Sequence, residues 1–265
     1  KPVTALSAGK LLTLPKSSQR RSDCGQHFRH LAMTGPDSDK SDFRGPNFYG
    51  RRKGRKLRTT MQGLLDEQLP LLRYDPAKTP VAQFDHHPDD IFLEIGFGGG
   101  ESLAAVAATR PDAGFIGAEP FINGVAGLIR HTADQGLSNI RIWDDDVRLI
   151  LDSMSNACLA GVYILFPDPW PKRRHAARRI LAPAVLNELA RLVRPEGSLV
   201  LASDHPVAKS WLLQAACSHP DFRWTACRPV DWRTRPQALV PTRYMRKAER
   251  ESRIPNWFLF ERRPG

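Results

Sequence analysis

The stretch Leu93-Glu94-Ile95-Gly96-Phe97-Gly98-Gly99-Gly100 joins an apolar run to an acidic residue and then to closely spaced glycines. Residues 91–95 are mostly apolar and can form a buried strand. The glycines that follow tolerate positive φ and let a ligand approach the backbone closely. A helical pattern begins at Glu101, and the free N–H groups of its first turn can meet a polar ligand. The pattern predicts a nucleotide-type pocket at the end of a strand.

The carboxylate of Glu94 narrows the choice of ligand. A dinucleotide fingerprint counted from Gly96 needs a glycine at position 101, where this chain has Glu. A further carboxylate beside a pyrophosphate would also repel it, which disfavours an NAD-dependent enzyme. S-adenosylmethionine carries a sulfonium and an ammonium but no phosphate, and so it tolerates this carboxylate. Taken alone, the glycine loop fits an ordinary tight turn as well as a cofactor loop.

Length and composition limit the number of domains and the classes of protein to which the chain can belong. In a chain of 265 residues, strand and helix patterns alternate over residues 85–263, which fits one α/β domain. The four cysteines show no metal-type spacing, and we expect reduced thiols and no bound metal. No apolar run approaches the ~18 residues of a membrane span, and the first thirty residues lack a signal-peptide core. We expect a soluble cytoplasmic protein that makes no membrane contact.

The N-terminal part of the chain is basic and irregular. Residues 1–46 are rich in Ser, Gly, Pro, Lys and Arg without a sustained period, which predicts disorder. We interpret the residues before Met33 as an extension that is partly non-native. Residues 47–84 are predicted to form a basic segment and then a helix over 60–72 that packs on the edge of the domain.

A net charge of +11 attracts polyanions, and nucleic acid is the leading candidate partner. The basic segment supports this interpretation because its cations are interleaved with aromatic residues that can stack on bases. The alternatives are a merely basic surface, a solvated tail or a targeting signal. Counted with the residues just before it, this basic stretch contains the aromatic residues Phe43, Phe48 and Tyr49 and the basic residues Arg44, Arg51, Arg52, Lys53, Arg55, Lys56 and Arg58.

The alternation of strands and helices predicts a doubly wound α/β fold with a mostly parallel seven-stranded sheet. The expected strands are 91–95, 114–118, 140–143, 162–166, 198–203, 222–227 and 257–261. The expected helices after the glycine loop are 123–135, 147–154, 183–193 and 207–217. The last two strands have no full helix between them, which indicates an antiparallel addition at one edge. In such folds ligands bind at the carboxyl ends of the strands.

Acidic residues stand at the predicted strand ends. Glu119 ends the second strand, where a carboxylate can accept hydrogen bonds from both hydroxyls of a ribose. Asp146 follows the third strand and can accept from an adenine amino group, although Asp144 and Asp145 are alternatives. All of these residues could instead cap helices. So many carboxylates on one rim would repel one another unless a cationic ligand lies among them.

The segment Phe166-Pro167-Asp168-Pro169-Trp170-Pro171-Lys172 is the most specific motif. Its prolines fix the backbone on both sides of Asp168, and Trp170 offers a stacking face. A second basic cluster follows in residues 172–179. A purely structural turn is the alternative, but it leaves the coincidence of acid, aromatic and basic residues at the ligand rim unexplained.

With these motifs the chain resembles the bacterial tRNA (guanine-N7-)-methyltransferases, which have the class I S-adenosylmethionine-dependent fold. The resemblance covers residues 48–262, with 85–265 as the methyltransferase domain. The Phe-Pro-Asp-Pro-Trp element is close to diagnostic, whereas many methyltransferases share the glycine loop. The matching segments are residues 93–100, Gly117-Ala118-Glu119, 136–141, 166–172, Ser203-Asp204 and Pro241-Thr242-Arg243-Tyr244.

The resemblance implies transfer of a methyl group from S-adenosylmethionine to N7 of a guanosine in the variable loop of tRNA. It implies that Asp168 is catalytic, and the chain is compatible with a monomer or a homodimer. The implied donor-binding residues are Glu94, Gly96, Gly98, Gly100, Glu119, Asp146 and Asp168. The implied substrate-side residues are Lys172, Asp204, Thr242, Arg243, Tyr244 and Met245.

Met245 departs from the family pattern, which usually has Glu at this position. A carboxylate there could accept hydrogen bonds from the guanine N1–H and amino edge, and a thioether replaces it poorly. Glu249 or Glu251 could serve instead. Two other functions stay open: a methyltransferase acting on another RNA base or a protein, and a non-catalytic RNA-binding protein with a degenerate pocket, which only Met245 favours.

Overall fold

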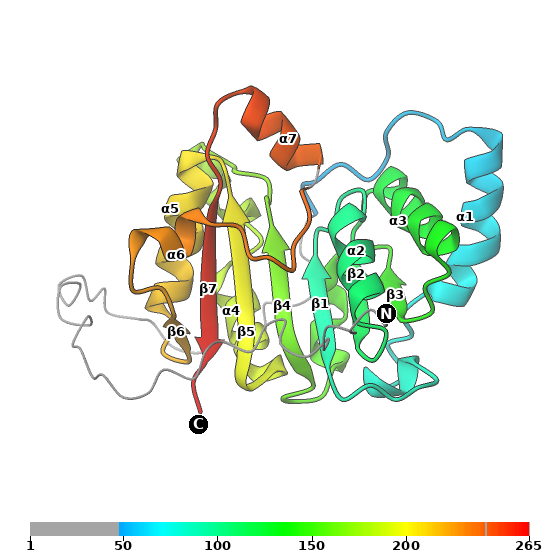
Figure 1. Ribbon diagram of the computed structural model, residues 1–265, viewed down its shortest axis with the longest axis horizontal. Helices are drawn as coiled ribbons and strands as arrows, with labels where there is room; N and C mark the ends of the chain where they lie inside the picture. The colour runs from blue at the N-terminus through cyan, green and yellow to red at the C-terminus, as the bar shows by residue number, and fades with distance from the viewer. Residues whose placement is uncertain (1–47, 242, 265) are drawn as a thin grey trace, which may run out of the picture. The chain divides into compact units, whose positions relative to one another are not determined.

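The computed structural model describes residues 48–241 and 243–264, which form a seven-stranded sheet flanked by helices (Figure 1). Residues 1–46, for which disorder was predicted, lie outside the described residues, and so does the proposed start at Met33. The strand order is β3-β2-β1-β4-β5-β7-β6. The strands are β1 (Ile91–Ile95), β2 (Gly114–Ala118), β3 (Ile140–Trp143), β4 (Leu159–Leu165), β5 (Val193–Ser203), β6 (Phe222–Trp224) and β7 (Asn256–Arg262).

The sheet confirms the predicted parallel topology and its antiparallel edge. β3, β2, β1, β4 and β5 pair in parallel, whereas β7 runs antiparallel to both β5 and β6. β1, β2 and β4 are buried along their whole length, as expected for strands covered on both faces. The carboxyl ends of the parallel strands therefore meet at one edge, where the glycine loop leaves β1.

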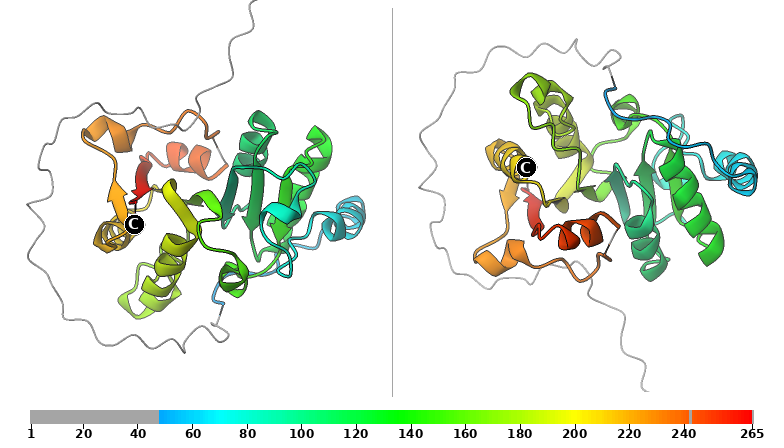
Figure 2. Two further views of the ribbon diagram at one scale, coloured as in Figure 1. Left: turned by 90° about the horizontal axis from the view of Figure 1, so that it is seen from below. Right: turned by 90° about the horizontal axis from the view of Figure 1, so that it is seen from above.

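Helices cover both faces of the sheet. Figure 2 shows α2, α3 and α7 on one side and α4 and α5 on the other, while α1 lies beyond β3. Leu65 and Leu69 are the buried residues of α1, which packs on α3. The helices are α1 (Thr59–Leu72), α2 (Glu101–Thr109), α3 (Ile122–Gln135), α4 (Pro183–Leu192), α5 (Pro206–Ser218), α6 (Pro229–Arg233) and α7 (Arg243–Arg250). No helix in the described part of the chain is both long and apolar enough to cross a membrane.

The helix predicted over residues 147–154 is wrong. Two short 3-10 helices, η2 (Val147–Leu149) and η3 (Leu151–Ser153), occupy this stretch. Ile150 between them has φ −121° and ψ −10°, outside the α-helical region, so a continuous helix cannot form. The strand predicted over 222–227 is also shorter than expected, since it ends at Trp224. Two further 3-10 helices, η1 (Val81–Gln83) and η4 (Arg173–Arg178), and the helices α6 and α7 were not predicted.

Candidate active site

A cavity of about 510 Å³ opens at the carboxyl ends of the parallel strands. Its volume lies within the range of roughly 300–1,000 Å³ that small-molecule sites occupy. The walls come from the ends of β1, β2 and β4, from the start of η2, and from two segments distant in sequence, residues 48–51 and 178–180. Its charged lining contains five acidic residues and four arginines: Glu94, Glu101, Glu119, Asp146 and Asp168, with Arg51, Arg148, Arg178 and Arg179.

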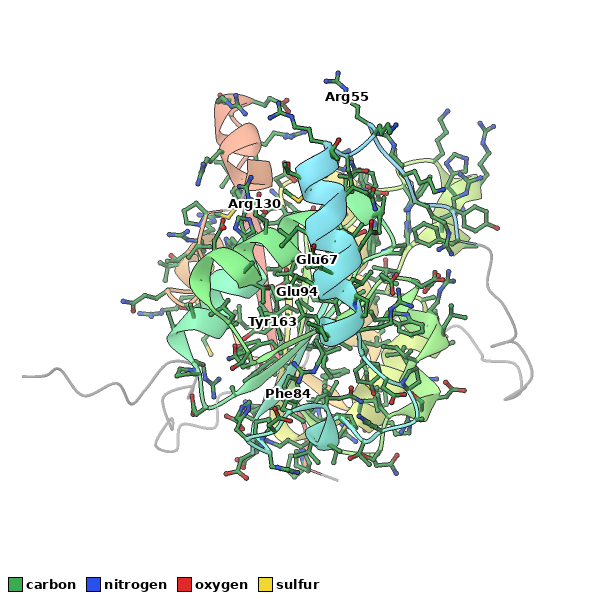
Figure 3. All side chains as sticks on the ribbon, turned by 90° about the vertical axis from the view of Figure 1, so that its right-hand side faces the viewer. Arg55, Glu67, Phe84, Glu94, Arg130 and Tyr163 are labelled. Carbon is green, nitrogen blue, oxygen red and sulfur yellow. The ribbon has the colours of Figure 1, made fainter. Side chains whose placement is uncertain are left out.

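Glu94 places a buried carboxyl at the inner wall of this cavity. The residue is 4% exposed, and Figure 3 shows it inside the molecule near Tyr163, its register partner on β4. Within the described residues, no group donates a hydrogen bond to the Glu94 carboxylate. Burial, with the nearby charges of Glu119 and Glu101, raises the pKa of Glu94 to about 8. This carboxyl therefore holds a proton at neutral pH until a cation reaches it.

Glu119 fixes the glycine loop from the end of β2. Its two carboxylate oxygens accept hydrogen bonds from the backbone N–H of Gly98 at 2.9 Å and of Phe121 at 3.0 Å. Burial raises the pKa of Glu119, the two N–H donors lower it, and the charge of Asp168 raises it. The remaining lone pairs face the cavity, where they can accept further hydrogen bonds.

The glycine loop has the conformation that its sequence predicts. Gly96, Gly98 and Gly100 have φ values of 75°, 59° and 78°, in the left-handed region that favours glycine. Gly96 and Gly98 line the cavity, but Gly100 does not. A Cβ at Gly100 would come within 2.6 Å of the Leu128 side chain, so this glycine allows α2 and α3 to pack closely.

Of the three adjacent aspartates after β3, only Asp146 lines the cavity. Asp144 pairs with Arg73 at 2.9 Å and Asp145 with Arg52 at 2.7 Å, which ties them to the N-terminal part of the chain. Asp146 caps η2 by accepting from the backbone N–H of Arg148 and also binds the guanidinium of Arg148. Asp146 thus has a structural partner as well as a place in the cavity wall.

Asp168 lies at the mouth of the cavity on a constrained turn. Phe166 and Trp170 have φ values of 54° and 38°, a conformation that is costly for large side chains. A hydrogen bond ties the turn to α5, because the indole N–H of Trp211 donates to the carbonyl of Pro169 at 3.2 Å. Asp168 itself is exposed, and within the described residues no basic side chain forms an ion pair with it. The carboxylate is therefore held in place and available to a ligand.

The predicted substrate-side residues lie outside the cavity lining. Lys172 is exposed at the start of η4, and Asp204 pairs with Arg253 at 2.9 Å. Met245 is buried on α7, with 6% of its surface exposed. Thr242 lies outside the described residues, as do the side chains of Arg243 and Tyr244.

Several cavity residues could not be identified from motifs. Phe48, Tyr49 and Arg51 were expected to contact nucleic acid, but they line this cavity together with Arg178 and Arg179. The only signal in the sequence was their aromatic and basic character, because the proximity of the two segments depends on the tertiary fold.

Comparison with known proteins relates this chain to methyltransferases. The family model described as "Putative methyltransferase" matches residues 88–254. The tRNA (guanine-N(7)-)-methyltransferase of Rhodospirillum rubrum is 46% identical over 236 residues, covering 86% of this chain and 91% of that protein. The protein of the same name from Nitrobacter winogradskyi is 42% identical, covering 82% and 86% of the two chains.

The chain belongs to the tRNA (guanine-N(7)-)-methyltransferase family. Membership confirms the resemblance inferred from the motifs, and the sheet order confirms the class I methyltransferase fold. A solved 16S rRNA methyltransferase, KamB, is 16% identical with a TM-score of 0.47, covering 69% of this chain and 91% of that chain.

S-adenosylmethionine is the methyl donor of this family, and the residues of the cavity fit it. The buried Glu94 carboxyl lacks a cationic partner within the described residues, and the donor carries two cationic groups. Glu119 has lone pairs left over for hydroxyl donors. The observed burial and charge therefore match the chemistry of this cofactor.

Gly124 on α3 keeps the glycine loop and this helix in close contact. A Cβ at position 124 would overlap the backbone carbonyl oxygen of Gly98. We expect Gly124→Ala to lower the free energy of unfolding by about 1–3 kcal/mol and to weaken donor binding. Thermal unfolding and calorimetry with S-adenosylmethionine measure the two effects.

Gly63→Ala on α1 is the matched control for Gly124→Ala. Nothing lies within 4 Å of a Cβ at position 63, and Ala is the better helix former by about 1 kcal/mol. This variant should be as stable as the wild type or more so, with unchanged donor affinity. Equal stability of Gly124→Ala and the wild type would contradict the close contact.

Proposed function

We propose that this chain methylates N7 of a guanosine in tRNA and that Asp168 is its central catalytic residue. The observation that carries the proposal is the cavity itself. It gathers the carboxyls of Glu94, Glu119 and Asp146 at strand ends and holds Asp168 at its mouth between two prolines. Membership of the family supports the reaction and the cofactor.

Each acidic residue has a proposed role in holding the donor. Glu94 compensates positive charge at the inner wall, and Glu119 accepts hydrogen bonds from the ribose hydroxyls while it fixes Gly98. Asp146 lies where it can accept from the adenine amino group, with Arg148 keeping its carboxylate oriented. Gly96 and Gly98 leave room for the donor beside the backbone.

Guanine N7 carries an in-plane lone pair and no proton, and the reaction therefore needs no general base. The donor supplies a methyl group bound to positively charged sulfur. The work of the protein is to position N7 and to stabilise the positive charge that develops on the purine. Asp168 suits this second role, because its carboxylate lies at the mouth of the cavity without an ion-pair partner among the described residues.

The exposed basic residues beside the cavity are proposed to hold the tRNA by its phosphates. Lys53, Arg55 and Lys56 are exposed, and Arg55 extends away from the ribbon in Figure 3. Lys172 and the η4 residues Arg173 and Arg174 form a second exposed cluster. We further propose that the target guanosine lies in the variable loop, as the resemblance implies, and that the enzyme acts on tRNA in the cytoplasm.

We expect tRNA affinity to fall as salt rises, because binding neutralises phosphates and releases counterions. Replacing Lys53, Arg55 and Lys56 together by Ala should weaken binding and reduce the salt slope by about one for each phosphate that the variant no longer neutralises. Filter binding at several salt concentrations measures both. Arg130→Ala, an exposed change on α3 beside Asp134, is the control. An unchanged slope in the triple variant would exclude these residues as phosphate ligands.

The decisive experiment incubates the purified protein with radiolabelled S-adenosylmethionine and unmodified tRNA and then identifies the labelled nucleoside. We expect the label in 7-methylguanosine, and mapping it tests the variable-loop position. Label in another nucleoside would reassign the substrate. Donor binding without label would point to a base-recognition defect at Met245, and absence of donor binding would support a non-catalytic RNA-binding protein.

A further inference from the structure

Residues 48–55, which we call the strap, are fixed at one end to the start of α3. The backbone N–H of Ile122 donates to the carbonyl of Arg52 at 3.0 Å. Asn123 accepts from the N–H of Gly54 at 2.8 Å and donates to the carbonyl of Arg55 at 2.7 Å. An ion pair between Arg52 and Asp145 adds to these hydrogen bonds. This end of the strap therefore moves with the α/β domain.

The other end of the strap meets η4 across the mouth of the cavity. The guanidinium carbon of Arg178 lies 4.5 Å from the ring centre of Tyr49 and 5.0 Å from that of Trp170. All three residues line the cavity, although Tyr49 is 129 positions from Arg178 in the sequence. No carboxylate among the described residues forms an ion pair with Arg178, so the two aromatic rings are its recognised partners there.

We propose that Arg178 is a positioning residue that clamps the strap over the donor cavity by contacting Tyr49 and Trp170. This inference rests on the proposed donor pocket and adds a means of retaining the donor. Phe48, Tyr49 and Arg51 form part of the cavity wall, and Tyr49 is the one of them that Arg178 contacts from η4. Trp170 follows Asp168 by two residues, so the same clamp joins the strap to the catalytic turn.

The alternative is that Arg178 binds phosphate like its neighbours Arg173 and Arg174. Those two side chains are exposed, whereas Arg178 is half-buried and in contact with two rings. A phosphate-binding residue would change tRNA binding but leave donor affinity in the absence of RNA untouched. A clamp changes donor affinity without any RNA present.

Calorimetry with S-adenosylhomocysteine, without tRNA, distinguishes the two. We expect Arg178→Ala and Tyr49→Ala each to weaken binding by about tenfold and the double variant to be no worse than either one. Tyr49→Phe should bind like the wild type because it keeps the ring face. Arg178→Lys should recover only part of the affinity, since an ammonium keeps the charge but not the planar stack. Arg174→Ala is the matched control and should leave donor affinity unchanged.

A second readout uses the strap itself as a protease target. Trypsin can cut after Arg51, Arg52 and Lys53, and mass spectrometry identifies each cut. We expect S-adenosylhomocysteine to protect these sites in the wild type and to protect them much less in Arg178→Ala. This comparison also stands if one variant proves unstable, because the wild type alone must show protection.

Three results would overturn the clamp: wild-type donor affinity in Arg178→Ala, additive losses in the double variant, or strap cleavage that the donor does not change in the wild type. These results are distinct from failure of the proposed function. If the wild type binds no donor at all, the pocket assignment fails, whereas normal wild-type binding with an unaffected Arg178→Ala variant overturns only the clamp.

Discussion

Asp168→Asn is expected to lower the turnover number by about 100- to 1,000-fold while the affinity for S-adenosylmethionine changes little. The amide keeps the size of the side chain and its place between the prolines, but it removes the negative charge. That charge lies at the cavity mouth, without an ion-pair partner among the described residues, where we propose that the purine becomes positive. Single-turnover methylation of tRNA and calorimetry of the donor measure the two quantities separately.

Asp144→Asn is the control for Asp168→Asn. Asp144 also follows a strand end, but it pairs with Arg73 and does not line the cavity. Its replacement should leave turnover within about twofold, because partly exposed ion pairs contribute little. Wild-type turnover in Asp168→Asn would remove the charge of Asp168 from the mechanism. A loss confined to donor affinity would instead make Asp168 a binding residue.

Local sequence patterns predicted the sheet well because short periodic signals determine it. The bounds of β1, β2 and β3 agree with the prediction, since each is a short, mostly apolar run that ends at a glycine or an acidic residue. The prediction of a helix over residues 147–154 failed because the apolar residues of this stretch fit a helical pattern. In the structure, Asp146 and Ile150 hold the backbone in two short 3-10 helices. Periodicity does not report such local hydrogen bonds.

Motifs located the strand-end carboxylates of the site but not the contacts between distant segments. Glu94, Glu119 and Asp168 could be chosen because the fold places strand ends together. The choice of Asp146 over Asp144 and Asp145 required knowing that Arg73 and Arg52 occupy the other two. The contact of Tyr49 with Arg178 likewise depends on the path of the strap and has no local signature.

Glu94→Gln is expected to make the protein more stable and its donor binding weaker. The pKa of Glu94 is about 8 in the folded protein against an ordinary value of 4.5. Between these values the folded state binds a proton that the unfolded state has released, so stability falls as pH rises through this window and is lowest above pH 8. At pH 7 this proton uptake lowers the free energy of unfolding by up to about 3 kcal/mol, relative to a protein with a neutral side chain at this position.

The neutral amide of Glu94→Gln removes this cost. We expect its melting temperature to exceed that of the wild type by on the order of 5 °C at pH 7, and the difference to shrink at pH 5 and grow at pH 9. Thermal unfolding across this range measures it. A difference independent of pH would mean that the Glu94 carboxyl does not titrate in this window.

Donor binding should respond in the opposite direction. In the wild type the Glu94 carboxyl must release its proton to meet a cation, so affinity should rise by up to about tenfold per pH unit from pH 6 towards pH 8. Glu94→Gln should bind about 10- to 100-fold more weakly at pH 8 and should not show this pH dependence. Calorimetry in buffers of different ionisation enthalpy reports the proton released. Wild-type binding without proton release would show that the carboxyl is already ionised or does not meet the donor.

A variant that gains stability while binding the donor more weakly would mean that the buried charge destabilises the free protein because it serves the ligand.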